Sequence, residues 1–276
     1  MYPLKESKVQ LMSLALTRKI QFAFDPIKLE ELAQKHHQAY VNGVPFPHAV
    51  FDDFLTEEFL DRVYWEFPKP EEASWAKHYH EDSRKLAFND ETQMGEFTWL
   101  LLAQLNSSPF VKFLEKLTGI EGLIPDPHFI GGGLHQIERA GFLNIHADFN
   151  KHEKLKLDRR LNLLLYLNKD WKEEYGGHLE LWRPDTSGCE KSLLPIFNRC
   201  VIFSTTDFSF HGHPKPLNCP ADQTRKSLAL YYYSNGRPAE EVSPSHSTLY
   251  QKSSGKPYPI EKESRIRRFL KTLTSS

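Results

Sequence analysis

The spacing of hydrophobic residues changes near residue 125, and this change predicts two structural regions in the chain. Before residue 125, apolar residues recur three and four positions apart, which is typical of helices. Asp25-Pro26 is a helix-start pattern, and Leu29, Ala33 and Tyr40 follow it at helical spacing. Further helices are predicted from residue 56, over residues 94–105 and over residues 108–119, with one strand within residues 44–54.

Short apolar runs alternate with turn residues after residue 125, a pattern typical of a β-sandwich or barrel. Strands are predicted at residues 128–137, 142–146, 161–167, 178–182, 199–204, 209–212 and 225–234. Gly176-Gly177 indicates a turn or a close approach of the backbone. We therefore expect one integrated domain, in which a helical lead-in (1–124) packs on a β-rich core (125–237). A polar, proline-containing wrap with a helix at 260–273 forms the remainder (238–276).

Composition and charge narrow the class of protein. The chain has 276 residues, of which 39% are hydrophobic and 26% charged, as in soluble globular proteins. Its 35 basic and 36 acidic residues leave a net charge of −1, so the chain lacks the overall basic field that would favour nucleic acid or anionic membranes. Since no apolar run approaches the roughly 20 residues that span a bilayer, we expect no membrane partner.

Cysteine usage indicates a reducing environment. The three cysteines, Cys189, Cys200 and Cys219, are too few and too unevenly spaced for a disulfide framework or a zinc knuckle. The apolar stretch at residues 11–16 is too short for a signal peptide. These features predict a cytoplasmic protein, and nothing in the sequence indicates its oligomeric state.

One histidine–acid pair is the first candidate for chemistry. The pattern His-x-Asp/Glu occurs at His80, His146 and His178. The first pair lies in a polar stretch, YHEDSRK, that we interpret as a solvated loop, and the third lies on a strand that can simply expose its histidine. The pair His146-Ala147-Asp148 ends a β-like segment. Because strand residues i and i+2 share a face, both side chains are expected to point into the same space.

A third metal ligand is available from the segment FSFHGHPKPL, about 65 residues after His146. Either His211 or His213 can provide it, since both lie on one face of the predicted strand. Two imidazoles and one carboxylate form a facial triad, which leaves three positions of an octahedral Fe(II) open.

A carboxylate-binding pair follows at the start of the apolar strand RKSLALYYY. Arg225 and Ser227 share a face, so a guanidinium and a hydroxyl can grip one carboxylate together. Lys226 is expected to point the opposite way. A buried arginine needs an anionic partner, and a bound acid would provide one.

These motifs resemble the Fe(II)- and 2-oxoglutarate-dependent dioxygenases, in particular their prolyl 4-hydroxylase-like branch. The matching stretches are GFLNIHADFN, RRLNLLLYLNKDW, GGHLELW, NRCVIFSTTDFSFHGHPKPL and RKSLALYYYS. The resemblance implies a mainly β fold with α additions, a double-stranded β-helix (a cupin-like jelly-roll) buttressed by the N-terminal helices.

The resemblance also implies roles for individual residues. His146, Asp148 and His211 match the iron ligands, which favours His211 over His213. Arg225 matches the basic residue that binds the distal carboxylate of 2-oxoglutarate. The gap of 14 residues between His211 and Arg225 is longer than in many members, and we expect its insertion NCPADQ to lengthen a loop without moving the strand.

Further inner-face residues are candidates for the co-substrate pocket. Ser227 is the hydroxyl neighbour of Arg225. Asn162 and Tyr166 alternate on one strand face and are expected to bind the co-substrate, although ordinary inward packing explains them nearly as well. The same two interpretations apply to Tyr231 and Tyr233.

By this resemblance, Fe(II) is the cofactor and 2-oxoglutarate and O2 are co-substrates. The expected reaction is hydroxylation of an unactivated C–H group of an amino acid, a peptide or protein side chain, or a natural product, with release of succinate and CO2. Trp171 and Trp182 can belong either to the core or to a wall of the substrate site.

Two other classes of protein stay open. A non-catalytic jelly-roll binding module would need neither the triad nor Arg225, and a metal-dependent jelly-roll enzyme that does not use 2-oxoglutarate would not need Arg225.

Overall fold

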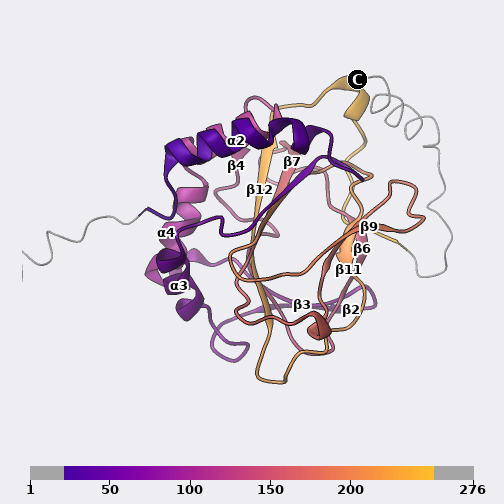
Figure 1. The fold of residues 1–276 in the computed structure, drawn as a ribbon. Helices are drawn as coiled ribbons and strands as arrows, with labels where there is room; N and C mark the ends of the chain where they lie inside the picture. Colours follow the sequence, from indigo (N-terminus) through magenta and orange to yellow (C-terminus); the bar gives the residue numbers. More distant parts are fainter. Residues whose placement is uncertain (1–21, 252–276) are drawn as a thin grey trace, which may run out of the picture.

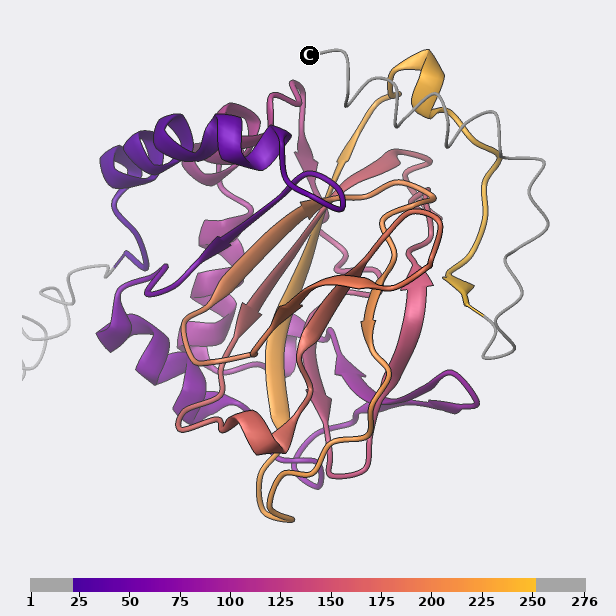
Figure 2. The same ribbon diagram turned by 45° about the vertical axis from the view of Figure 1, so that its right-hand side comes forward.

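A curled antiparallel sheet forms the centre of the molecule, as Figures 1 and 2 show for the computed structural model, which describes residues 22–251. Its strands are β1 (His48–Phe51), β2 (Ala76–His80), β3 (Ser83–Phe88), β4 (Ile124–Pro125), β5 (Gly133–Ile137), β6 (Leu143–Ala147), β7 (Asp158–Tyr166), β8 (Leu179–Trp182), β9 (Cys189–Leu193), β10 (Cys200–Ser204), β11 (His211–His213), β12 (Arg225–Ser234) and β13 (Leu249–Tyr250). Neighbouring strands follow the order β1-β10-β7-β12-β5-β3-β6-β11-β8-β9, and β2, β4 and β13 pair with β3, β12 and β6. The predicted mainly β jelly-roll fold is confirmed.

Within residues 22–251, four helices cover one face of this sheet. They are α2 (Pro26–Val41), α3 (Glu57–Glu66), α4 (Glu96–Leu105) and α5 (Ser108–Thr118), and short 3₁₀ turns lie at Glu91–Gln93, Glu173–Tyr175 and Ala239–Glu241. In Figure 2 the helices lie to the left of strands β10, β7 and β12, and strands β6, β8, β9 and β11 lie on the other side. The helices therefore buttress one layer of the curled sheet and leave its inner face to the site.

Alternation along β7 separates the structural core from the pocket. Leu161, Leu163 and Leu165 are buried in the core under the helices. Asn162 and Leu164 point the other way and line the inner pocket. The strand can serve both layers because successive side chains point to opposite faces.

Strand β12 obeys the same rule, and the predicted register is confirmed. Leu228 and Leu230 belong to the core under the helices, whereas Arg225 and Ser227 line the pocket. Lys226 points away from the pocket as expected, and it is half-buried, with its ammonium 6.0 Å from the centre of the Phe67 ring. Although the loop after β11 is long, β12 begins at Arg225.

Aromatic packing fastens the helices to the sheet. Phe110 of α5 is fully buried, and its ring lies 5.5 Å from that of Phe24, 5.3 Å from that of Phe113 and 6.4 Å from that of Tyr232 on β12. The Tyr232 hydroxyl donates a hydrogen bond to the carbonyl of Leu105 at the end of α4 (2.9 Å). These contacts link α4 and α5 to the middle strand of the sheet.

Three features differ from the sequence-based expectations. The stretch YHEDSRK is not a loop but the turn of a β2–β3 hairpin, in which β2 is exposed along its whole length and therefore has no apolar pattern. Strand β9 was missed because its residues are mostly exposed on the sheet edge. The strand predicted at residues 128–137 begins only at Gly133, since a turn with left-handed backbone at Phe129 and Gly131 precedes it.

The C-terminal part of the wrap returns to the sheet. Strand β13 pairs with β6, so that Leu249 lies opposite Ala147 and Tyr250 opposite His146. The helix predicted at residues 260–273 and the apolar stretch at residues 11–16 lie outside the described residues. Within residues 22–251, no helix has the length and apolar character needed to cross a membrane.

The buried position of Phe110 yields a stability prediction. Phe110→Ala is expected to lower the free energy of unfolding by about 3–5 kcal/mol, because the cavity between α5 and β12 cannot be filled by neighbouring rings. Urea unfolding followed by circular dichroism measures this loss. Lys112→Ala, two residues along the same helix, is the control, and an equal loss in both variants would contradict the role of the Phe110 packing.

Candidate metal centre and co-substrate pocket

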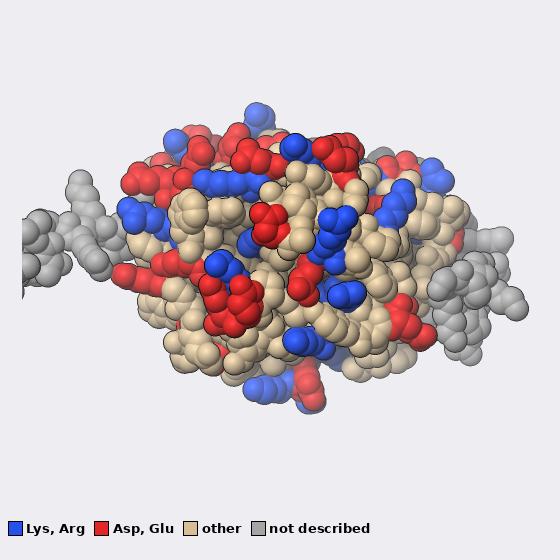
Figure 3. All heavy atoms as spheres, turned by 90° about the horizontal axis from the view of Figure 1, so that it is seen from below, with Lys and Arg blue, Asp and Glu red and all other residues tan. Residues whose placement is uncertain are grey.

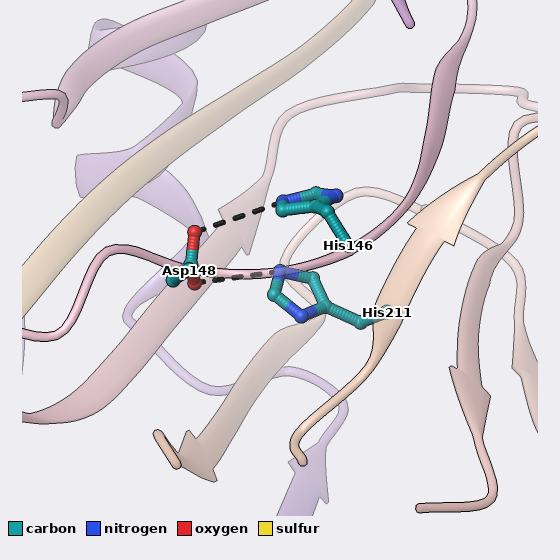
Figure 4. Close-up of side chains that lie close together, drawn as sticks. All are labelled: His146, Asp148 and His211. Carbon is teal, nitrogen blue, oxygen red and sulfur yellow. Dashed lines mark ion pairs between the residues drawn. The ribbon is translucent and has the colours of Figure 1, made fainter. Parts of the chain in front are cut away.

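Antiparallel pairing brings two histidines together at the inner face of the sheet. His146 on β6 and His211 on β11 are register partners, and their ring centres lie 4.4 Å apart. Asp148 follows β6 directly, and its Oδ1 and Oδ2 lie 3.6 Å from His146 Nε2 and 3.5 Å from His211 Nε2 (Figure 4). All three side chains are buried, and one ligand atom from each falls within 4.8 Å of the others.

The hydrogen bonds of both imidazoles leave the inward nitrogens free for a metal. His146 Nδ1 lies 2.8 Å from the Asn144 carbonyl oxygen, and His211 Nδ1 lies 2.9 Å from the Ser209 carbonyl oxygen. A carbonyl accepts only, so Nδ1 of each ring carries the proton and Nε2 keeps its lone pair. Burial and the neighbouring His146 lower the pKa of His211 to about 4, which keeps this ring neutral at physiological pH. Metal ligands need this protonation state.

Two donors orient the carboxylate of Asp148. Arg159 Nη2 and Asn162 Nδ2 each donate a hydrogen bond to Asp148 Oδ2, both at 3.0 Å. Although burial alone would raise the pKa of Asp148, the positive charge of Arg159 opposes this effect, and the pKa lies well below its usual range. The carboxylate is therefore ionised, and Oδ1 is available to a cation.

Arg225 lies at the other end of the same pocket, buried without a carboxylate partner among the described residues. Its Nε donates to the Gly177 carbonyl (2.7 Å), its Nη2 donates to the Tyr166 hydroxyl (3.2 Å), and its guanidinium carbon lies 4.9 Å from the centre of the Tyr166 ring. A Cβ at position 177 would lie 2.9 Å from Arg225 Cδ, and Gly177 has a φ of +73°, so this position needs glycine. These neutral contacts hold the guanidinium and leave its charge uncompensated.

The other residues predicted to lie in the pocket have the following positions and contacts. Ser227 and Asn162 line the pocket, and Tyr166 reaches it through its bond to Arg225. Tyr231 also lines it and donates a hydrogen bond from its hydroxyl to the Gly131 carbonyl (2.8 Å). The hydroxyl of Tyr233 is buried and makes no hydrogen bond within the described chain.

His213 also lines the pocket, but it lies outside the triad. Both of its ring nitrogens are buried without a hydrogen-bond partner in the described structure. Burial and the charge of Arg225 keep its pKa well below the usual value, so the ring is neutral. The compact cluster contains His211 and not His213.

Sequence reasoning missed two cations near the site. Lys85 lines the pocket from β3, in the segment that we had interpreted as a loop. Arg159 was missed because strict alternation would place it beside Leu161 on the helix-facing side. The pairing of β7 with β12 shifts its register between Tyr232 and Tyr233, so that Arg159 lies opposite Tyr233 and turns towards the triad.

The fold and the site together give a jelly-roll whose inner pocket has a triad of possible metal ligands at one end and a buried guanidinium without a carboxylate partner among the described residues at the other. Residues 132–233 match the model of the 2OG-Fe(II) oxygenase superfamily. The chain therefore contains a 2OG-Fe(II) oxygenase domain, and its fold is of the prolyl-hydroxylase type. The resemblance noted from the motifs is confirmed.

Similar proteins support this assignment. Prolyl 3-hydroxylase OGFOD1 of Mus musculus is 27% identical over 208 residues, which are 72% of this chain and 34% of that protein. The chain thus spans about a third of the length of the curated relatives it matches.

Solved structures show the same fold. A Pseudomonas putida prolyl-4-hydroxylase has a TM-score of 0.51 at 14% identity, with 74% of this chain and 99% of that chain covered. A Trichoplax adhaerens prolyl hydroxylase, in complex with a peptide fragment of the hypoxia inducible factor oxygen degradation domain, has a TM-score of 0.52 at 17% identity and covers 78% and 94%.

The bond from Asn162 to Asp148 yields a prediction about metal affinity. Asn162→Leu is expected to weaken binding of a divalent metal to the protein about tenfold, because a neutral donor that orients the carboxylate is lost. Titration of the metal-free protein with Co(II), followed by absorption, measures this affinity. Ser227→Ala alters the far end of the pocket and should bind Co(II) like the unchanged protein. If both variants bind Co(II) unchanged, Asn162 does not orient the ligand.

Proposed function

We propose that this chain is an Fe(II)- and 2-oxoglutarate-dependent oxygenase that hydroxylates a C–H group of a peptide or protein substrate. The observation that carries the proposal is one pocket with two ends. A compact triad of His146, Asp148 and His211 forms one end, and the uncompensated guanidinium of Arg225 forms the other. A non-catalytic module would need neither end, and a metal enzyme that uses no acid co-substrate would not need the second.

The triad fits Fe(II) by its donor set. Two neutral imidazoles and one carboxylate on one side of a metal leave three positions for ligands, which is the facial arrangement of non-haem Fe(II) oxygenases. The orphaned Oδ1 of Asn162, buried beside Asp148, is a further acceptor that faces this pocket. With iron bound, the site would supply the reaction in which O2 oxidises 2-oxoglutarate to succinate and CO2 and a C–H group of the substrate to an alcohol.

The residues of the chain then position the reactants. Arg225 and Ser227 hold the distal carboxylate of 2-oxoglutarate, since a guanidinium binds a carboxylate through two parallel hydrogen bonds. Tyr166 keeps the guanidinium in place through its hydroxyl. The apolar walls Leu164 and Leu179 limit the water that reaches the metal.

The substrate class is inferred from the relatives. The curated relative is named as a prolyl 3-hydroxylase, and one of the solved structures holds a peptide fragment. A peptide or protein side chain is therefore preferred over a free amino acid or a natural product. Incubation of the protein with Fe(II), 2-oxoglutarate and a proline-containing peptide library, followed by mass spectrometry for a gain of one oxygen, tests the activity. Absence of both succinate and oxidised peptide would contradict it.

The cellular context is part of the proposal. Cys189, Cys200 and Cys219 are all free thiols, which suits a reducing compartment, and we propose the cytoplasm. The architecture proposed with it is a catalytic core at residues 125–237, with residues 1–124 and 238–276 packed around it as parts of one domain.

Loss of any triad residue should abolish hydroxylation. His146→Ala, Asp148→Ala and His211→Ala each remove one of three protein ligands, so the affinity for Fe(II) and the turnover at limiting iron should both collapse. Iron content after gel filtration and succinate formation are the measurements. His213→Gln should retain its iron. If this variant loses iron while His211→Ala retains it, His213 and not His211 is the metal ligand.

Replacement of Arg225 should act on the co-substrate selectively. Arg225→Ala is expected to raise the KM for 2-oxoglutarate about tenfold to a hundredfold, since a charge-assisted hydrogen bond contributes roughly 1.5–3 kcal/mol. Arg225→Lys should restore only part of this, because an ammonium cannot bind bidentately. Steady-state kinetics with varied 2-oxoglutarate measure the effect. Lys226→Ala, on the opposite face of β12, is the control, and a stronger effect there would show that the inner face is assigned wrongly.

A further inference from the structure

Lys85 is the charged side chain in the pocket to which the proposed function gives no role. It lies on β3, half-buried, and lines the pocket together with the triad and Arg225. Its ammonium makes no hydrogen bond or ion pair within residues 22–251. A lysine that only covers apolar surface usually extends its ammonium into water, whereas this one faces the inside of the curled sheet.

Strand register places Lys85 beside Arg225. Arg225 on β12 pairs with Ile137 on β5, and Leu86 on β3 pairs with Gln136, so Lys85 lies level with Ile137 on its other side. Leu86 belongs to the core under the helices, which turns Lys85 to the inner face. Since neighbouring strands lie about 4.8 Å apart, the two cationic residues start roughly 10 Å from each other across one strand.

The charges around Lys85 act on the protonation of its ammonium. Burial lowers the pKa of Lys85 to about 8, the charge of Asp148 opposes this, and Arg159 and Arg225 add to it. The pocket that Lys85 lines contains the triad at one end and Arg225 at the other. Asp148 already accepts hydrogen bonds from Arg159 and Asn162, so the anion that Lys85 lacks has to come from outside the described chain.

We propose that Lys85 is a second cationic contact for the bound 2-oxoglutarate, acting beside Arg225. This inference rests on the proposed function. The two negative charges of a dianion in this pocket would then be balanced by Arg225 on β12 and Lys85 on β3. The pocket would then select a dicarboxylate over a monocarboxylate more strongly than Arg225 does alone.

Binding rather than turnover tests the proposal. The Fe(II)-loaded protein is titrated anaerobically with 2-oxoglutarate at saturating metal, and the Kd is measured by calorimetry. Lys85→Met, which keeps an unbranched chain of nearly the same length but removes the charge, should raise the Kd about tenfold. Lys85→Arg should retain most of the affinity. Arg84→Met, the exposed neighbour on the opposite face of β3, should leave the Kd unchanged.

The companion ligand 2-oxobutanoate shows which end Lys85 contacts. It lacks the distal carboxylate, so a penalty of Lys85→Met that disappears with this ligand assigns Lys85 to the distal end. A penalty that persists assigns it to the end nearer the metal, and either result supports the contact.

Failure of this inference is distinguishable from failure of the proposed function. If Arg225→Ala weakens binding of 2-oxoglutarate while Lys85→Met leaves the Kd unchanged, the Lys85 contact is overturned and the function stands. If the unchanged, metal-loaded protein does not bind 2-oxoglutarate, both are overturned. Should Lys85→Met not fold, Lys85→Gln is measured by the same titration and read in the same way.

Discussion

The backbone pairing of His211 with His146 is the constraint on which the site depends. Two antiparallel strands hold the rings 4.4 Å apart, and the carbonyls of Asn144 and Ser209 fix which nitrogen of each ring faces inward. A slip of one residue in this pairing would turn one of the rings out of the site, because successive side chains point to opposite faces.

Buried charge shapes the rest of the pocket. A buried ion without a partner destabilises a protein. The carboxylate of Asp148 is stabilised by the hydrogen bonds that Arg159 and Asn162 donate to it. Arg159 is itself enclosed, with its guanidinium carbon 3.5 Å from the centre of the Tyr231 ring and 4.4 Å from that of Phe149. The cation is thus stabilised by ring faces as well as by the carboxylate. Arg225 has no acidic partner in the part of the chain that the structure describes, so the charge at its end of the pocket is not compensated, whereas that of Asp148 is.

Much of this could be predicted from local sequence. The period-two pattern of RKSLALYYYS predicted which residues of β12 face inward, and the His-x-Asp spacing predicted a shared face for His146 and Asp148. Two kinds of structural feature could not be predicted from such patterns. The exposed strands β2 and β9 carry no apolar period, since only their backbones hold them in the sheet. Arg159 faces the site because the pairing shifts locally between β7 and β12, and a single strand's sequence does not show where its partner shifts.

Figure 3 shows that acidic and basic side chains are interspersed on the face that it presents, so charge on this surface does not gather into a field of one sign. Selective placement of charge occurs inside the molecule. Lys85 and Arg225 line one pocket from two different strands, and Arg159 on a third strand donates to Asp148, the one carboxylate that lines this pocket among the described residues.

Strand β6 is paired on both of its edges beside that pocket. One edge of β6 pairs with β11, and on the other edge β13 places Tyr250 opposite His146, with the two rings 5.4 Å apart. The backbone N–H of Gln251 donates to the carbonyl of Ile145 (2.8 Å) and extends this edge. His146 is therefore held from both sides, by segments about 65 and 104 residues further along the chain. Asp148 lies one residue beyond the strand, where no ladder reaches it, and this is why its orientation depends on the side chains of Arg159 and Asn162.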